Sequence, residues 1–259
     1  MVSKIKKPSV FLQLTEGIRY CIDVIKVLFF VFNYNFKRQG DKHPVLVIPG
    51  LVCTDFSTLL LRRFINNLGY TAYGWALGRN LGDLKDLNDI KKLQKRVTEI
   101  RSKHKGKITL IGWSMGGIYA RELAKLEPEL YHQVITIGAP FADAYAPNNV
   151  EWFYNYVLGN QEDIDVNWRE QMPVPAKIRT TALYSKQDGL VPWEACQEII
   201  EDDLHRNIEI TTGSHWGLVT NAEVFKIIAE QLPFSEINNN TLLGMEKTYR
   251  SEVVIFVVH

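Results

Sequence analysis

The chain has 259 residues, of which 46% are hydrophobic, and 30 basic side chains stand against 29 acidic ones for a net charge of +1. This length fits one large α/β domain, and the composition is that of a globular protein rather than a disordered one. A net charge so close to zero gives no electrostatic reason to expect nucleic acid as a partner. The bulk properties therefore favour chemistry on a small molecule.

The cysteines indicate a reducing environment. Cys21, Cys53 and Cys196 are widely spaced and odd in number, and they form neither a CxxC pair nor a disulfide framework. We therefore expect a cytoplasmic protein. No group of histidine, cysteine and carboxylate residues has the spacing of zinc ligands, so the sequence predicts no metal site.

The segment 1–39 begins with lysines and continues into an apolar stretch, in the order typical of a signal peptide. Asp23 and Lys26 lie within or beside that stretch, and no small-residue cleavage site follows. The uncharged run from Val27 to Phe36 is too short to span a membrane. We expect an amphipathic helix packed on the body of the protein. Peripheral contact with a membrane, which would make the protein membrane-associated, is the alternative.

Short apolar runs alternate with longer segments of helical periodicity in residues 40–234, which predict the core. We expect strands at 44–50, 70–77, 107–112, 133–140, 177–185 and 207–211, helices at 56–68, 84–104, 116–128 and 221–232, and a helix that ends at Asp202 and Asp203. This alternation predicts an α/β fold with a mostly parallel central sheet and helices on both faces. Ligands bind at the carboxyl ends of such strands, so the residues that follow each strand are the functional candidates.

Two segments break the alternation. Residues 141–176 are too long for a simple connection and are rich in aromatic side chains. This favours a lid or binding insertion, and a patch that seals the edge of the core is the alternative. The tail at 235–259 contains three consecutive asparagines and then VVIFVV. It is compatible with an edge strand or with an extension that has no function.

The segment GWSMG lies between a predicted strand and a predicted helix, which is the context that the G-x-S-x-G motif requires. A serine on so sharp a turn needs small residues two positions away on either side, and Gly112 and Gly116 meet this need. Gly117 lets the helix pack closely behind the turn. The N–H group of Met115 would face the place where an oxyanion forms. The pattern therefore predicts that Ser114 is a nucleophile.

A serine hydroxyl is a weak nucleophile without a base. Of the six histidines, His215 lies in the loop between the last strand and the last helix of the core. With this motif the orienting acid comes between serine and histidine in the chain. Asp188 is favoured because it follows a strand in an Asp-Gly turn, and Asp143 in the insertion is the second choice. A Pro-Gly pair after the first strand would turn the N–H group of Leu51 toward the serine as a second oxyanion donor.

Five motifs in chain order carry a resemblance to a known family: GDKHPVLVIPG, GWALGRN, GWSMGG, YSKQDGLVPW and NIEITTGSHWGL. With them, residues 40–233 resemble the α/β-hydrolase superfamily, and more closely a bacterial subgroup of its lipases and esterases. The resemblance implies an α/β-hydrolase fold in which Ser114, Asp188 and His215 form a triad. It also implies cleavage of carboxylic esters through an acyl-enzyme intermediate, without a cofactor. This chain has Pro-Gly where many lipases have His-Gly, and the turn glycine is kept.

We expect substrate contacts from aromatic side chains beside the serine and histidine and in the insertion: Trp113, Phe141, Trp152, Phe153 and Trp216. Arg79 and Asn80, in GWALGRN, have no evident chemical role and are expected to structure their loop. The expected partner is a small-molecule or lipid ester. An acyltransferase that uses the same acyl-serine and a catalytically silent binding protein are the alternatives. The intact serine, acid and histidine argue against the silent protein. The acyl chain, the alcohol and the oligomeric state stay open.

Overall fold

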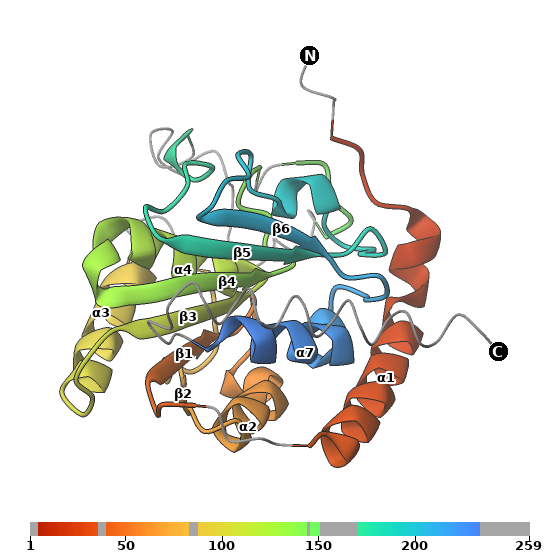
Figure 1. Cartoon of the computed structure of the whole chain (residues 1–259). Helices are drawn as coiled ribbons and strands as arrows, with labels where there is room; N and C mark the ends of the chain where they lie inside the picture. Colours follow the sequence, from red (N-terminus) through yellow and green to blue (C-terminus); the bar gives the residue numbers. More distant parts are fainter. Residues whose placement is uncertain (1–4, 36–39, 83–87, 144–145, 151–169, 234–259) are drawn as a thin grey trace, which may run out of the picture.

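The computed structural model of the protein describes residues 5–35, 40–82, 88–143, 146–150 and 170–233. At its centre is a six-stranded sheet in the order β2-β1-β3-β4-β5-β6, in which every neighbouring pair is parallel (Figure 1). The strands are β1 Pro44–Ile48, β2 Thr71–Gly74, β3 Ile108–Trp113, β4 Tyr131–Ile137, β5 Arg179–Tyr184 and β6 His205–Glu209. The six predicted strands and the parallel sheet are thus confirmed.

The described residues also form five α-helices: α1 Val10–Asn33, α2 Leu59–Asn67, α3 Asn88–Arg101, α4 Met115–Leu126 and α7 Ala222–Gln231. Short 3₁₀ helices lie at η1 Asp55–Thr58, η2 Pro128–Leu130, η4 Trp193–Cys196 and η5 Leu218–Thr220. Among the residues described, no helix is both long and apolar enough to cross a membrane.

The prediction of a helix that ends at Asp202 and Asp203 is wrong, because η4 is the only helical segment between β5 and β6. Oδ1 of Asp202 accepts hydrogen bonds from the N–H groups of Leu204 and His205, both at 2.8 Å. Such bonds between side chain and backbone compete with helix formation.

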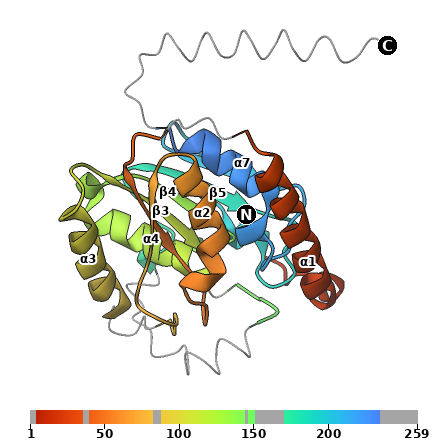
Figure 2. The same ribbon diagram turned by 90° about the horizontal axis from the view of Figure 1, so that it is seen from below.

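The two faces of the sheet are covered by different helices, as the alternation of side chains along β1 shows. Val45 and Val47 point to the face covered by α2 and α7, where they join the core around Phe64 and Phe225. Leu46 and Ile48 point to the opposite face and pack with α3 and α4. Figure 2 shows these two helical layers on either side of the sheet. The expectation of helices on both faces is confirmed.

Helix α1 lies outside these layers, at the edge of the molecule (Figures 1 and 2). It packs against α7 and η5 and buries Val27 in the core that α2 and α7 share. The side chain of Ser9 caps its first turn, because Oγ accepts a hydrogen bond from the N–H group of Phe11 at 3.3 Å. From this position α1 runs past the carboxyl ends of the strands, where functional residues are expected.

Candidate active site

Ser114 occupies a strained turn between β3 and α4. Its backbone has φ 53° and ψ −125°, a conformation that residues with a side chain rarely adopt. The N–H group of Ser114 donates to the carbonyl oxygen of Ile137 at 2.8 Å, which ties the turn to the end of β4. The residue is only 4% exposed. The sheet therefore holds the serine in a conformation that an isolated loop would not keep.

The glycines around the serine are sterically required. A Cβ atom at Gly112 would overlap the carbonyl group of Gly116, and a Cβ atom at Gly116 would overlap the carbonyl oxygen of Ile48. At Gly117 a Cβ atom would overlap the side chain of Ala139. The close approach of α4 to β1, to β3 and to the end of β4 therefore explains all three elbow glycines predicted from the sequence.

Three polar side chains from distant parts of the chain meet at the carboxyl edge of the sheet. Nε2 of His215 lies 3.0 Å from Oγ of Ser114, and Nδ1 of His215 lies 2.6 Å from Oδ2 of Asp188. Asp188 and His215 are each 4% exposed. The second-choice acid, Asp143, is exposed, and it is Asp188 that contacts the histidine. The structure thus brings together the three residues that the sequence singled out.

The loop after β5 fixes the carboxylate of Asp188. Its Oδ1 atom accepts hydrogen bonds from the N–H groups of Leu190 and Val191 at 2.8 and 2.9 Å. Oδ2 is left to face the imidazole. These bonds set the orientation of the carboxylate toward His215.

Opposing effects act on the pKa of His215. Burial lowers this pKa, but the charge and hydrogen bond of Asp188, together with the charge of Glu16, raise it above the usual value for histidine. Two acidic residues thus favour the protonated imidazole in a site that water scarcely reaches.

The loop after β1 approaches the serine from the other side. A Cβ atom added at Gly50 would lie 3.3 Å from Cβ of Ser114, which places the following residue, Leu51, beside the turn. Val52 has φ 54°, so the loop is strained as well. The predicted oxyanion residue Met115 begins α4, where the first N–H groups have no partner within the helix.

Arg79 and Asn80 structure this loop, as expected from the sequence. Nδ2 of Asn80 donates to the carbonyl oxygen of Pro49 at 2.9 Å, and the backbone of Asn80 exchanges hydrogen bonds with Val52 and Cys53. Arg79 donates to the carbonyl oxygen of Val52 at 2.9 Å. The GWALGRN motif therefore holds the conformation of the loop that contains Leu51.

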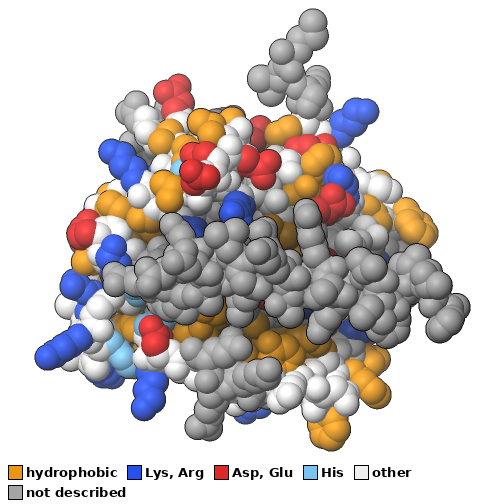
Figure 3. All heavy atoms as spheres, viewed as in Figure 1, with side chains coloured by type: hydrophobic (Ala, Val, Ile, Leu, Met, Phe, Trp, Pro, Cys, Tyr) orange, Lys and Arg blue, Asp and Glu red, His pale blue; other side chains and the backbone are white. Residues whose placement is uncertain are grey.

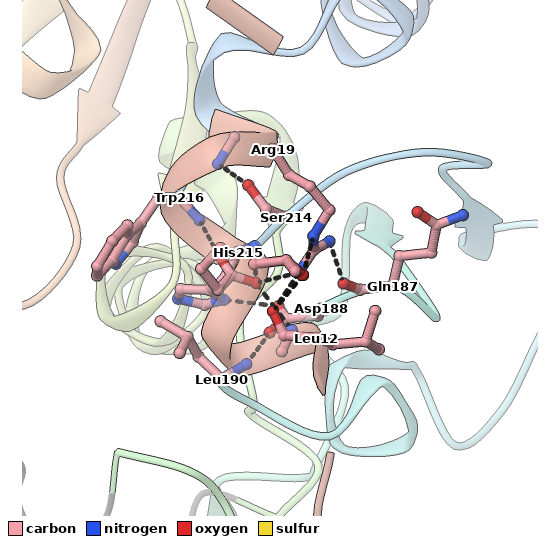
Figure 4. A network of polar contacts seen from close by, with 12 residues as sticks. Leu12, Arg19, Gln187, Asp188, Leu190, Ser214, His215 and Trp216 are labelled. Carbon is pink, nitrogen blue, oxygen red and sulfur yellow. Dashed lines mark hydrogen bonds and ion pairs between the residues drawn. The ribbon is translucent and has the colours of Figure 1, made fainter. Parts of the chain in front are cut away.

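Glu16, on α1, contributes to the site, although no pattern in the sequence predicts this role. Its Oε1 atom accepts hydrogen bonds from the N–H groups of Gly189 at 2.9 Å and His215 at 3.1 Å, and Oε2 lies 3.4 Å from the N–H nitrogen of Trp216. Arg19 pairs with Glu16 at 3.0 Å and donates to the carbonyl oxygen of Gln187. Figure 4 shows α1 running past the loops of Asp188 and His215. One carboxylate therefore ties both loops to the same helix.

Two glycines permit this close contact. A Cβ atom at Gly189 would overlap the backbone of α1 at Leu12. A Cβ atom at Gly217 would overlap the carboxylate of Asp23, another buried acid on α1. The glycines of the motifs YSKQDGLVPW and SHWGL thus serve the docking of α1, a role that no local pattern signals.

The aromatic candidates for substrate contacts have different surroundings. Nε1 of Trp113 donates to the carbonyl oxygen of His215 at 3.1 Å, and Trp216 is 47% exposed beside that histidine. Phe141 has no exposed surface and packs under the guanidinium group of Arg121, which is the placement of a core side chain. Trp152 and Phe153 lie outside the described residues, as does most of the predicted lid at 141–176 and all of the tail at 235–259.

Comparison with known proteins places the fold. No protein-family model matches the sequence, and no curated protein matches it significantly. A mature lipase from Bacillus licheniformis superimposes with a TM-score of 0.55 and 17% identity, over 78% of this chain and 95% of that one. An α/β superfamily hydrolase from Oenococcus oeni PSU-1 gives a TM-score of 0.55 at 14% identity, over 77% of this chain and 98% of that one. Lipase B of Aspergillus fumigatus gives 0.56 at 15%, over 77% and 54% of the respective chains.

At these identities the comparisons establish the fold and nothing finer. The chain has the α/β-hydrolase fold, and its structural neighbours include lipases. Among the described residues no group of three or more histidine, cysteine, aspartate or glutamate side chains could hold a metal ion.

Proposed function

We propose that the chain is a serine hydrolase that cleaves carboxylic esters. The proposal depends above all on the hydrogen bonds that run from Ser114 through His215 to Asp188, at 3.0 and 2.6 Å. A serine that is bonded to a histidine, which is itself oriented by a buried carboxylate, is the arrangement that activates a hydroxyl for attack. The named lipases among the structural neighbours support an ester as the substrate.

In the first half of the reaction, Oγ of Ser114 forms a bond to the carbonyl carbon of the ester. Its proton passes to Nε2 of His215, and the carbonyl electron pair moves onto the oxygen. Asp188 holds the imidazole in the tautomer that can accept this proton and stabilises the imidazolium ion without itself becoming protonated. When the carbonyl re-forms, the bond to the alcohol breaks and the alcohol leaves with the proton from His215.

In the second half, water attacks the acyl-serine. His215 takes a proton from the water and returns it to Oγ of Ser114 when the carboxylic acid leaves. In both halves the N–H groups of Leu51 and Met115 would hold the oxyanion. Loss of one such donor typically costs about 100-fold to 1000-fold in rate.

An acyltransferase would form the same acyl-serine and differ only in the acceptor. Supplying candidate alcohols together with an ester, and then measuring hydrolysis and transfer products, separates the two. We expect the acid to be the main product, because the hydrolysis requires no acceptor other than water.

The test is labelling with a fluorophosphonate probe and turnover of nitrophenyl esters from short to long acyl chains. Ser114→Ala should abolish labelling and turnover while the chain stays folded, as measured by circular dichroism. Ser102→Ala is the matched control and should keep both; this serine directly follows α3, and its Oγ donates to the carbonyl oxygen of Glu99. Unchanged turnover in Ser114→Ala would refute the proposal.

A further inference from the structure

Most of the charged side chains of α1 point toward the protein and away from water. The helix has four of them, Glu16, Arg19, Asp23 and Lys26. Glu16 and Asp23 are 2% and 4% exposed, and Arg19 points to the body, where it bonds to Gln187. Only Lys26 is exposed. An ordinary surface helix turns its charged residues to water and its apolar residues to the protein.

The outer face of α1 is correspondingly apolar. Nine large apolar side chains there are at least 44% exposed: Val10, Phe11, Leu14, Ile18, Ile22, Ile25, Leu28, Phe29 and Phe32. Their spacing of three and four residues places them along one side of the helix. From Phe11 to Phe32 this side is about 32 Å long, at 1.5 Å per residue. In the space-filling view, hydrophobic side chains stand at the margin where α1 lies (Figure 3).

A patch of this size marks an interaction surface, and the charges around it indicate the partner. Lys6, Lys7 and Lys26 are exposed, whereas both acidic residues between positions 5 and 35, Glu16 and Asp23, are buried. The segment therefore presents only positive charge to the outside. A broad apolar face bordered by lysines is typical of helices that lie in the interface of an anionic membrane. In a two-fold dimer through this face, both copies would bring positive charge to the interface, and neither segment has an exposed acidic residue to offset it.

We infer that the outer face of α1 docks on an anionic lipid surface. The helix would lie along the membrane, with its apolar side chains among the acyl chains and its lysines near the lipid phosphates. Since Glu16 on the inner face bonds to the loops of Asp188 and His215, docking would also place these loops close to the lipid. The benefit for an ester substrate rests on the proposed function, but the docking itself does not.

Flotation with vesicles tests the docking. All proteins carry Ser114→Ala, so that the lipid stays intact and the result does not depend on catalysis. The probe is a vesicle of equal parts phosphatidylcholine and phosphatidylglycerol, with pure phosphatidylcholine for comparison. We expect the full chain to float with the anionic vesicles, more weakly with the neutral ones, and less as salt is added.

Four substitutions on the outer face, Leu14→Gln, Ile18→Gln, Ile25→Gln and Phe29→Gln, should weaken partitioning onto the vesicles by roughly a hundred-fold or more. Glutamine keeps a helix propensity close to that of leucine, so α1 should still form. The matched control carries four substitutions of exposed side chains on the rest of the body: Leu126→Gln, Ile199→Gln, Ile200→Gln and Leu204→Gln. This control should float like the parent chain.

Activity on a soluble ester shows separately whether the outer-face substitutions leave the candidate active site intact. With Ser114 restored, the outer-face variant should hydrolyse a water-soluble nitrophenyl ester at the parent rate, because none of its four positions contacts the site. Failure of hydrolysis in the parent chain would then refute the proposed function and leave the docking standing.

Three results would overturn the docking. The first is that the full chain floats with neither vesicle, and the second is that the outer-face variant floats as well as the parent. The third is a concentration-dependent dimer in sedimentation velocity that the outer-face variant abolishes, since this would assign the face to a second copy of the chain.

Discussion

Replacing Glu16 by glutamine tests whether α1 supports the site through this one carboxylate. The change keeps the size of the side chain and removes the charge that faces the loops of Asp188 and His215. Glu16 is 2% exposed, so water would not replace the lost interactions.

The expected loss of stability follows from the bonds to Glu16. A hydrogen bond to a charged acceptor contributes about 1.5–3 kcal/mol, and one between neutral groups about 0.5–1.5 kcal/mol. The bonds from the N–H groups of Gly189 and His215 should each lose roughly 1 kcal/mol when the acceptor becomes neutral, and the ion pair with Arg19 is lost as well. We expect the free energy of unfolding to fall by about 2–3 kcal/mol.

The pH dependence of kcat/KM should change too. Burial lowers the pKa of His215, while Asp188 and then the charge of Glu16 raise it, with a net rise above the usual value. Only the neutral imidazole can act as a base, so kcat/KM falls as the pH drops through the pKa of His215. Removing the charge of Glu16 lowers this pKa, and the acid limb of the profile should therefore move to lower pH.

Urea unfolding and the pH profile on a soluble nitrophenyl ester measure both effects. Asp23→Asn is the matched control: it removes a second buried carboxylate from α1, whereas the acids that raise the pKa of His215 are Asp188 and Glu16. It should leave the acid limb in place. If Glu16→Gln lowers stability but also leaves the acid limb in place, then Glu16 holds the loops mechanically and the electrostatic reasoning is wrong. No loss of stability would refute the whole argument.

Three further predictions follow from the geometry. Asp188→Asn should lower kcat by roughly 10⁴-fold, because the imidazole takes the wrong tautomer; a small effect in single-turnover kinetics would exclude Asp188 as the orienting acid. Gly138→Ala should cost about 1–3 kcal/mol in urea unfolding, because Gly138 has φ 54° and its Cβ atom would lie 2.8 Å from Leu218. Gly17→Ala, within α1, should raise the unfolding midpoint by the equivalent of about 0.5–1 kcal/mol at unchanged activity, since its Cβ atom would have no neighbour within 4 Å beyond the backbone of the helix itself; a lower midpoint would contradict this.

Local patterns were enough to predict the strands of the sheet, though not where each one ends. The strand expected at 70–77 stops at Gly74. The carboxylate of Asp55 accepts hydrogen bonds from the N–H groups of Trp75 and Ala76, and these bonds draw the chain away from β1. β2 is also the edge of the sheet and has a partner on one side only. A contact between Asp55 and residues twenty positions away has no signature in hydrophobic periodicity.

The sequence by itself determined the order of the strands and of the helices apart from one expected before β6, the sharp turn at Ser114, and the chain order of Ser114, Asp188 and His215. These depend on short-range periodicity, on glycine sterics and on residues that directly follow strands. Only the tertiary structure decided that α1 packs beside the histidine with its charged residues inward. The apolar residues of that helix lie around most of its circumference, so its periodicity does not tell which side faces the protein. Glu16 and His215 are 199 positions apart, and only the packing of α1 brings them into contact.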